Sequence, residues 1–156
     1  MRKFMYVTLA MALLLGLAAC KGGRDSEEIW KTSHVQNILD SGAFSEELEE
    51  LDADTAFMLY RLSDCGLERE QLAETSARRS AGATCEELAV LIFDSTDSAT
   101  AAKSALEDYV QSQITANEDY RPAEIPKLEK AWIDQRSNSL LLVVANDMDA
   151  AKQAVE

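Results

Sequence analysis

The thiol of Cys20 lies where an apolar segment gives way to glycine and charge. Met1-Arg2-Lys3 forms a basic start, and residues 4–19 are uncharged and mostly apolar. This run of about 16 residues is shorter than the ~20 apolar residues that a bilayer-spanning helix needs. A basic start followed by a short apolar run is typical of an export signal, and small residues before a cut let the chain lie extended in a peptidase. The spacing therefore favours an export signal over a membrane span.

The segment Leu17-Ala18-Ala19-Cys20 resembles a bacterial lipobox. The resemblance implies that the Cys20 thiol receives a diacylglycerol and that a peptidase cuts between Ala19 and Cys20. Two acyl chains give stable anchoring where one chain is marginal. The competing interpretations are an uncleaved signal anchor and a cysteine placed there by chance.

The lipobox divides the chain into three parts. We expect a signal peptide over residues 1–19, a lipidated cysteine with a flexible tether over residues 20–25, and one extracytoplasmic domain over residues 26–156. Gly22-Gly23 suits a flexible tether. The expected location is the cell membrane, with the domain facing outside the cytoplasm.

Cys65 and Cys85 are the other two thiols. A disulfide between them would suit an extracytoplasmic domain and would close a loop of about 20 residues, worth about 3 kcal/mol. Two free thiols, buried as small apolar groups, are the alternative. Metal binding has little support, because His34 is the sole histidine and no Cys-x-x-Cys spacing occurs.

The sequence offers no recognisable catalytic constellation. A serine or cysteine nucleophile usually needs a base, often histidine, and we expect His34 to be a packed or surface residue of the first helix. Glu86-Glu87 opens an expected strand, where one of the two carboxylates can face solvent. Ser45 to Asp54 lacks the regular oxygen ligands and the glycine of a calcium loop. We therefore predict no enzymatic activity, no cofactor and no metal.

Net charge limits the choice of partners. The chain has 15 basic and 28 acidic residues. Without Arg2 and Lys3, 13 basic residues face 28 acidic ones, a net charge of −15. Such a surface repels phosphate backbones, so nucleic-acid binding is not expected. It suits solubility, a basic partner or the cations of a cell wall.

The second half of the chain gives the clearest elements. Strands are expected over residues 74–80, 86–93, 128–135 and 140–145, a long helix over 98–117, and a last helix from Met148. The run "LAVLIF" is apolar on both faces, which suits a strand that is covered on both sides or central in a sheet. Ala131 and Ile133 are expected on one face of their strand and Trp132 on the other, in the core or on the sheet.

The first half of the chain is less regular. A helix is expected to begin with Asp25 as its cap and to end near Ser41-Gly42. Residues 45–54 suggest a solvated turn or loop, and residues 55–62 a short apolar segment of either type. The element order predicts an α+β domain with a largely antiparallel sheet (strand-strand-helix-strand-strand-helix), helices packed on one face, and a preceding N-terminal helix.

The ordered segments resemble a family of small bacterial lipoproteins, mainly from clostridia and relatives, whose mature part is known only as domain of unknown function 4358. Besides the lipobox, the matching segments are "SAGATCEELAVLIF", "YRPAEIPKLEKAWI" and "NSLLLVVANDMDAA". The resemblance implies a cell-surface lipoprotein with an α+β fold, and it supplies no activity, ligand or catalytic residue. Cys65 and Cys85 are not part of the family pattern.

These observations favour a membrane-anchored, non-enzymatic module that binds an unidentified protein or envelope component. Tyr120 and Pro122 are the candidates for a recognition loop. In the competing interpretation, Pro122 ends the long helix and Tyr120 packs the corner. The alternative function is a small-solute or cation-binding lipoprotein that serves a transporter, although about 137 mature residues leave little room for two lobes.

Overall fold

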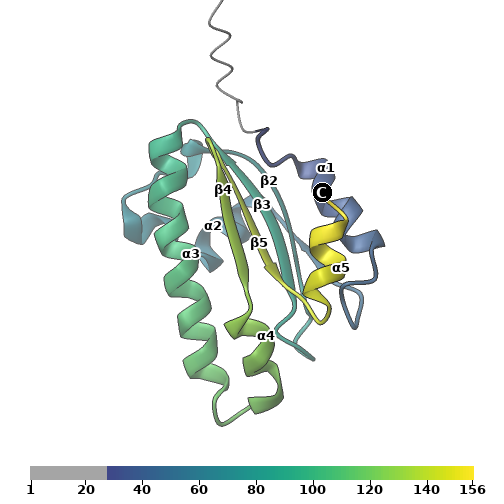
Figure 1. Cartoon of the computed structure of the whole chain (residues 1–156). Helices are drawn as coiled ribbons and strands as arrows, with labels where there is room; N and C mark the ends of the chain where they lie inside the picture. Colours follow the sequence, from purple (N-terminus) through teal and green to yellow (C-terminus); the bar gives the residue numbers. More distant parts are fainter. Residues whose placement is uncertain (1–27) are drawn as a thin grey trace, which may run out of the picture.

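A computed structural model describes residues 28–156 as a sheet with helices on both faces (Figure 1). The strands are β1 Glu49–Leu51, β2 Leu72–Arg79, β3 Glu87–Phe93, β4 Trp132–Arg136 and β5 Ser139–Val144. The α-helices are α1 Thr32–Asp40, α2 Ala53–Leu59, α3 Thr96–Asn117, α4 Ile125–Glu129 and α5 Met148–Gln153. Three short 3₁₀ helices are η1 Leu62–Cys65, η2 Arg69–Gln71 and η3 Pro122–Glu124.

The strand order is β1-β2-β3-β5-β4, and every neighbouring pair is antiparallel. The predicted α+β class and antiparallel sheet are therefore confirmed. β3 and β5 occupy the centre, where both of their faces are covered, and this position explains their uninterrupted apolar runs. The two strands pair from Glu87 opposite Val144 to Ile92 opposite Ser139.

The expectation that helices cover one face is wrong, because a separate core fills each face of the sheet. Ala89, Leu91, Leu140 and Leu142 point toward the larger core, which α2, α3 and α4 complete. Their neighbours in the strands point toward a second core, which α1, α5 and the preceding Trp30 complete. Since alternate residues of a strand face opposite sides, strands that are apolar at every position need cover on both sides.

Short polar side chains fix the ends of several helices. Ser95 Oγ accepts the backbone N–H of Ser98 at 3.1 Å and caps α3, and Asp147 caps α5 through Ala150 N–H at 3.0 Å. Gly66 follows η1 with φ +83°, a conformation that favours glycine. These boundaries lie within two residues of those expected from the sequence.

Three segments differ from expectation. Residues 128–129, expected to start a strand, instead end helix α4 Ile125–Glu129, where Pro126 fits the first turn. Residues 45–54 include the edge strand β1, where Glu50 pairs with Arg78 across the ladder at 3.0 Å. Helix α1 begins only at Thr32, and the expected cap Asp25 lies outside the described residues.

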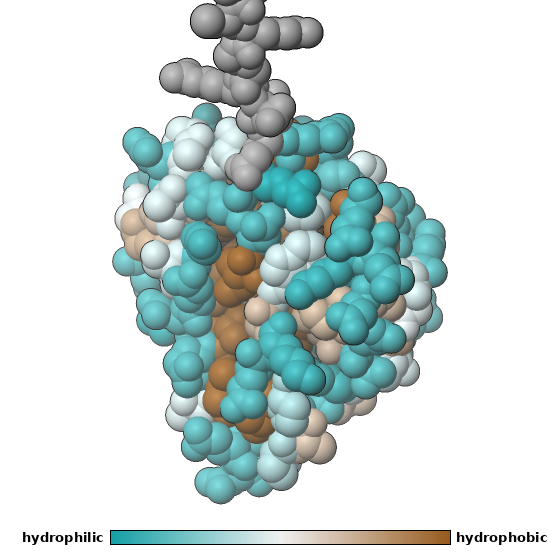
Figure 2. Space-filling model, in the orientation of Figure 1, coloured by the Kyte–Doolittle hydropathy of each residue, from teal (hydrophilic) through white to brown (hydrophobic). Residues whose placement is uncertain are grey.

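The surface around α3 is mostly hydrophilic, with one hydrophobic band running beside it (Figure 2). Four partly buried side chains at this junction of α3, α4 and β4 reach the surface from the larger core: Ile114, Ile125, Ala131 and Ile133. Trp132 packs against the other core, so the predicted division of β4 into two faces is confirmed. Within residues 28–156, no helix combines the length and apolar character needed to cross a membrane.

Candidate functional site

Three loops meet at the end of the sheet that lies away from the incoming N-terminal chain (Figure 1). The chain joins the fold at Trp30, whose backbone N–H donates to Ser139 Oγ at 2.7 Å at the start of β5. The three loops lie where Glu87 pairs with Val144, at the other end of β5. We call this region the distal end and define it as residues 43–47, 80–86 and 117–127.

Arg121 holds two of these loops together. Its guanidinium donates to the carbonyl oxygens of Gly82 at 2.8 Å and Thr84 at 3.0 Å. Its Nε donates to Asn117 Oδ1 at 2.9 Å, at the end of α3. Because guanidinium donors have a fixed planar arrangement, these three bonds set the turn over residues 80–84 against the end of the helix.

Buried Glu86 connects the third loop to the others. Its carboxylate accepts the backbone N–H of Ser45 at 2.8 Å and Ser45 Oγ–H at 2.6 Å. Lys127 Nζ donates to Glu86 at 2.8 Å and lies 3.2 Å from Glu124. Burial alone would lower the pKa of Lys127, but its hydrogen bonds to the two carboxylates raise it. The lysine therefore stays charged, and these contacts join the three loops of the distal end.

Tyr120 projects from the distal end. Its side chain is 79% exposed, so the alternative in which it packs the corner is wrong. Pro122 begins η3 after α3 has ended at Asn117, as expected for a residue that prevents helical continuation. Both recognition-loop candidates therefore belong to the distal end, and the Tyr120 ring is available to a partner.

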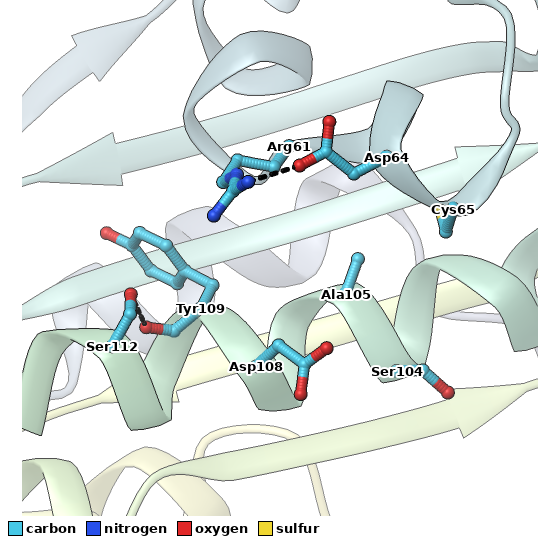
Figure 3. A pocket seen from close by; sticks show the side chains of 8 residues that line it. All are labelled: Arg61, Asp64, Cys65, Ser104, Ala105, Asp108, Tyr109 and Ser112. Atoms are coloured by element: carbon cyan, nitrogen blue, oxygen red, sulfur yellow. Dashed lines mark hydrogen bonds and ion pairs between the residues drawn. The ribbon is translucent and has the colours of Figure 1, made fainter.

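A small pocket lies between η1 and α3, about midway along the helix (Figure 3). Its volume is about 210 Å³. Arg61, Asp64 and Cys65 line one side, and five residues of α3 line the other: Ser104, Ala105, Asp108, Tyr109 and Ser112. Arg61 and Asp64 form an ion pair at 2.5 Å on the rim. Sequence reasoning missed this pocket, because its walls come from two separate segments, residues 61–65 and 104–112, with no motif in common.

Beneath the Tyr109 ring lies a buried carboxylate. Glu87 accepts the hydroxyl groups of Tyr60 at 2.6 Å and Tyr109 at 2.7 Å. Burial raises the pKa of Glu87, while these hydrogen bonds and the Arg79 charge 3.9 Å away partly oppose the shift. The expectation that Glu86 or Glu87 faces solvent is wrong, because both are buried and point to opposite faces of the sheet, each with its own partners.

Cys65 and Cys85 carry free thiols in the structure, so the bridge considered from their parity is not formed. Cys65 lies beside Ala105, and its thiol donates to the Leu62 carbonyl at 3.0 Å. Cys85 lies at the distal end, where its backbone N–H donates to Glu124 at 2.9 Å. Burial raises the pKa of both thiols, which makes them poor nucleophiles.

His34 and Trp132 belong to the packing around Trp30. The Trp30 ring meets His34 and Trp132 edge to face, with centroids 5.5 and 5.6 Å apart. Trp30 Nε1–H donates to Asp134 at 3.0 Å, and the Arg136 guanidinium lies 3.6 Å from its ring. Burial and nearby cations lower the pKa of His34. These residues fix the incoming chain, consistent with the packed interpretation of His34.

The metal prediction concerns the described residues, whereas the anchor prediction concerns residues outside them. Across residues 28–156, no group of three His, Cys, Asp or Glu side chains is arranged to hold a metal ion. The lipobox, with Ala19 and Cys20, lies outside the described residues.

Comparisons with known proteins give no relative: no family model, curated protein or solved structure matches this chain. The resemblance to domain of unknown function 4358 stays a prediction from sequence.

Proposed function

We propose that the protein is a lipid-anchored, extracytoplasmic module without enzymatic activity of its own, which uses its distal end to bind a protein or envelope component. The anchor is the Cys20 lipid implied by the lipobox. The distal end holds the exposed Tyr120 on loops that Arg121 and Lys127 fix in place.

The main support for this proposal is that the incoming chain and the distal end lie at opposite ends of the sheet. The chain coming from Cys20 joins the fold at Trp30, at one end of β5, and the three loops lie at the other end (Figure 1). Nine residues separate Cys20 from Trp30, and an extended chain of that length spans at most about 35 Å. A domain held this way would present its distal end away from the membrane surface.

The chemistry of the distal end favours a protein partner with basic residues. Tyr120 follows exposed Glu118-Asp119 and faces a partner with its ring and its hydroxyl. Tyrosine is enriched in binding surfaces because it offers a large contact area at low entropic cost. The net charge of −15 would draw a basic partner toward this surface.

The anchor is tested by metabolic labelling with a fatty acid. We expect the native protein to incorporate the label and the Cys20→Ala variant to lose it and leave the membrane fraction. Incorporation of label into Cys20→Ala would overturn the anchor.

The partner is tested in cells with a photo-crosslinking amino acid at position 120. Position 58 is the matched control, because Met58 is the other large hydrophobic side chain exposed among the described residues, at 69%, and lies on α2. We expect one dominant crosslinked protein from position 120 that position 58 does not yield. Identical sets of products from both positions would overturn the proposal.

The pocket between η1 and α3 is an observation in favour of the alternative, a solute-binding lipoprotein that serves a transporter. Its volume of about 210 Å³ is below the roughly 300–1,000 Å³ of sites that enclose a typical ligand. This pocket alone is therefore small for a transported solute, and the binding module remains the proposed main function.

A further inference from the structure

The pocket between η1 and α3 has a chemistry that the proposed function does not use. We infer that it binds a small organic cation, an amine on a short aliphatic chain. The site is separate from the distal end, so the test of one leaves the other standing.

The first reason is the wall formed by Tyr109. Its hydroxyl donates to the buried Glu87 carboxylate at 2.7 Å, so the pocket is lined by the ring while the polar end of the side chain is occupied. An ammonium group is attracted to an aromatic ring, so the Tyr109 ring gives the pocket a wall that suits a cation.

The second reason is the rim. Asp64 and Asp108 stand on opposite sides of the pocket, from η1 and α3 respectively (Figure 3). Asp64 already holds a cation there, the Arg61 guanidinium at 2.5 Å, whereas Asp108 forms no ion pair with any of residues 28–156. An incoming ammonium group would therefore pair first with Asp108 and would compete with Arg61 for Asp64.

The third reason is the size and lining of the pocket. Cys65 and Ala105 give it an apolar part that suits methylene groups, and a volume of about 210 Å³ suits a molecule of a few carbon atoms. The absence of a metal-holding group of side chains within the described residues favours an organic cation over a metal ion. The net charge of −15 raises the local concentration of any cation.

The inference is tested by calorimetric titration of the detergent-solubilised full chain with putrescine and cadaverine, at low salt. Glutarate, of similar length and opposite charge, is the control ligand. We expect saturable binding of the diamines and none of glutarate. Binding of glutarate alone, or of neither class, would overturn the inference.

Two matched variants locate the site. Asp108→Asn should weaken diamine binding about fivefold, because it removes an unpaired carboxylate from the rim. Glu107→Gln removes the same charge from the neighbouring exposed position, which does not line the pocket, and should leave the affinity unchanged. Equal weakening in both variants would mean that overall charge attracts the diamine, and the pocket would be refuted.

The variant Arg61→Gln gives the sharpest test, because the direction of its effect on affinity shows whether the pocket binds a cation or an anion. Removing the guanidinium frees Asp64, so a cationic ligand should bind several-fold more tightly. A ligand held by Arg61 would instead lose affinity. Weaker diamine binding in Arg61→Gln would therefore overturn the inference, and circular dichroism spectra would establish that each variant is folded.

Discussion

Glu87 carries a carboxylate into the core at the start of a central strand. Its only direct hydrogen-bond donors are the hydroxyls of Tyr60 and Tyr109 among the described residues. Burial outweighs these donors and the Arg79 charge, so its pKa lies above the usual 4.5. The folded state thus holds a proton on Glu87 more tightly than the unfolded chain does. The stability that this group contributes is present below about pH 4.5 and is lost as the pH rises through the folded-state pKa.

The variant Glu87→Gln removes this titration. We expect the difference in unfolding free energy between the native protein and the variant to favour the native protein most at and below pH 4.5, and to shrink as the pH rises through the raised folded-state pKa of Glu87. Urea unfolding at several pH values measures it, with Glu118→Gln on the exposed surface as the control. A difference that does not change with pH would contradict the raised pKa.

At the scale of elements, the sequence predicts segments whose signals are local. The apolar run of β3 and the capped, periodic α3 are such segments, and both were expected within two residues of their observed bounds. The sequence of β1, "EEL", has no strand pattern of its own. It forms a strand by pairing with β2, where its two glutamates lie opposite Arg78 and Arg79. α4 is a five-residue helix beside the Glu124–Lys127–Glu86 contacts, which no local pattern reveals.

The candidate sites divide in the same way. Tyr120 and Pro122 could be named from the sequence because a proline after a long helix marks a loop. The pocket needs Arg61 across from Asp108, and the buried cluster needs Tyr60 beside Glu87. Both juxtapositions depend on how α2, η1 and α3 pack on the sheet, which is long-range information.

The positions of Cys65 and Cys85 beside helix α3 explain why the two thiols do not form a disulfide. Cys65 lies beside Ala105, and Cys85 lies where Arg121 joins its loop to Asn117. Those helix positions are twelve residues apart, or about 18 Å along the axis, whereas a disulfide needs Cα atoms within about 7 Å.

We therefore expect two free thiols in the Cys20→Ala chain. They should react with a thiol reagent in urea without prior reduction, and dithiothreitol should leave the melting temperature unchanged. Thiols that react only after reduction would show that the bridge exists.

The rigidity of the distal end depends on the Arg121 side chain. Arg121→Ala removes three hydrogen bonds and should cost about 1–3 kcal/mol of stability, because hydrogen bonds to a charged group are being lost. Amide hydrogen exchange should accelerate over residues 80–86 and 118–124 while β4 and β5 stay protected. Lys130→Ala, in the same region but outside this network, is the control. Uniformly faster exchange throughout the fold would argue against a local role.

At the scale of the whole molecule, Trp30 is the joint between the tether and the domain. The fully buried indole packs against Trp132, lies under Arg136 and donates to Asp134, so it connects the incoming chain to the β4–β5 hairpin. Those contacts determine which end of the sheet the tether leaves from. If the anchor is on Cys20, they also determine which surface is turned toward the membrane and which is turned away.

Trp30→Ala should therefore destabilise the domain by about 3–5 kcal/mol, as expected for emptying a fully buried aromatic site. Trp30→Phe keeps an aromatic ring beside Trp132 and Arg136 but loses the bond to Asp134, so it should cost about 1–3 kcal/mol. Urea unfolding gives both values, and hydrogen exchange should show the β4–β5 hairpin to be the first region to lose protection. If Trp30→Ala were as stable as the native chain, the tether would not be fixed to the hairpin.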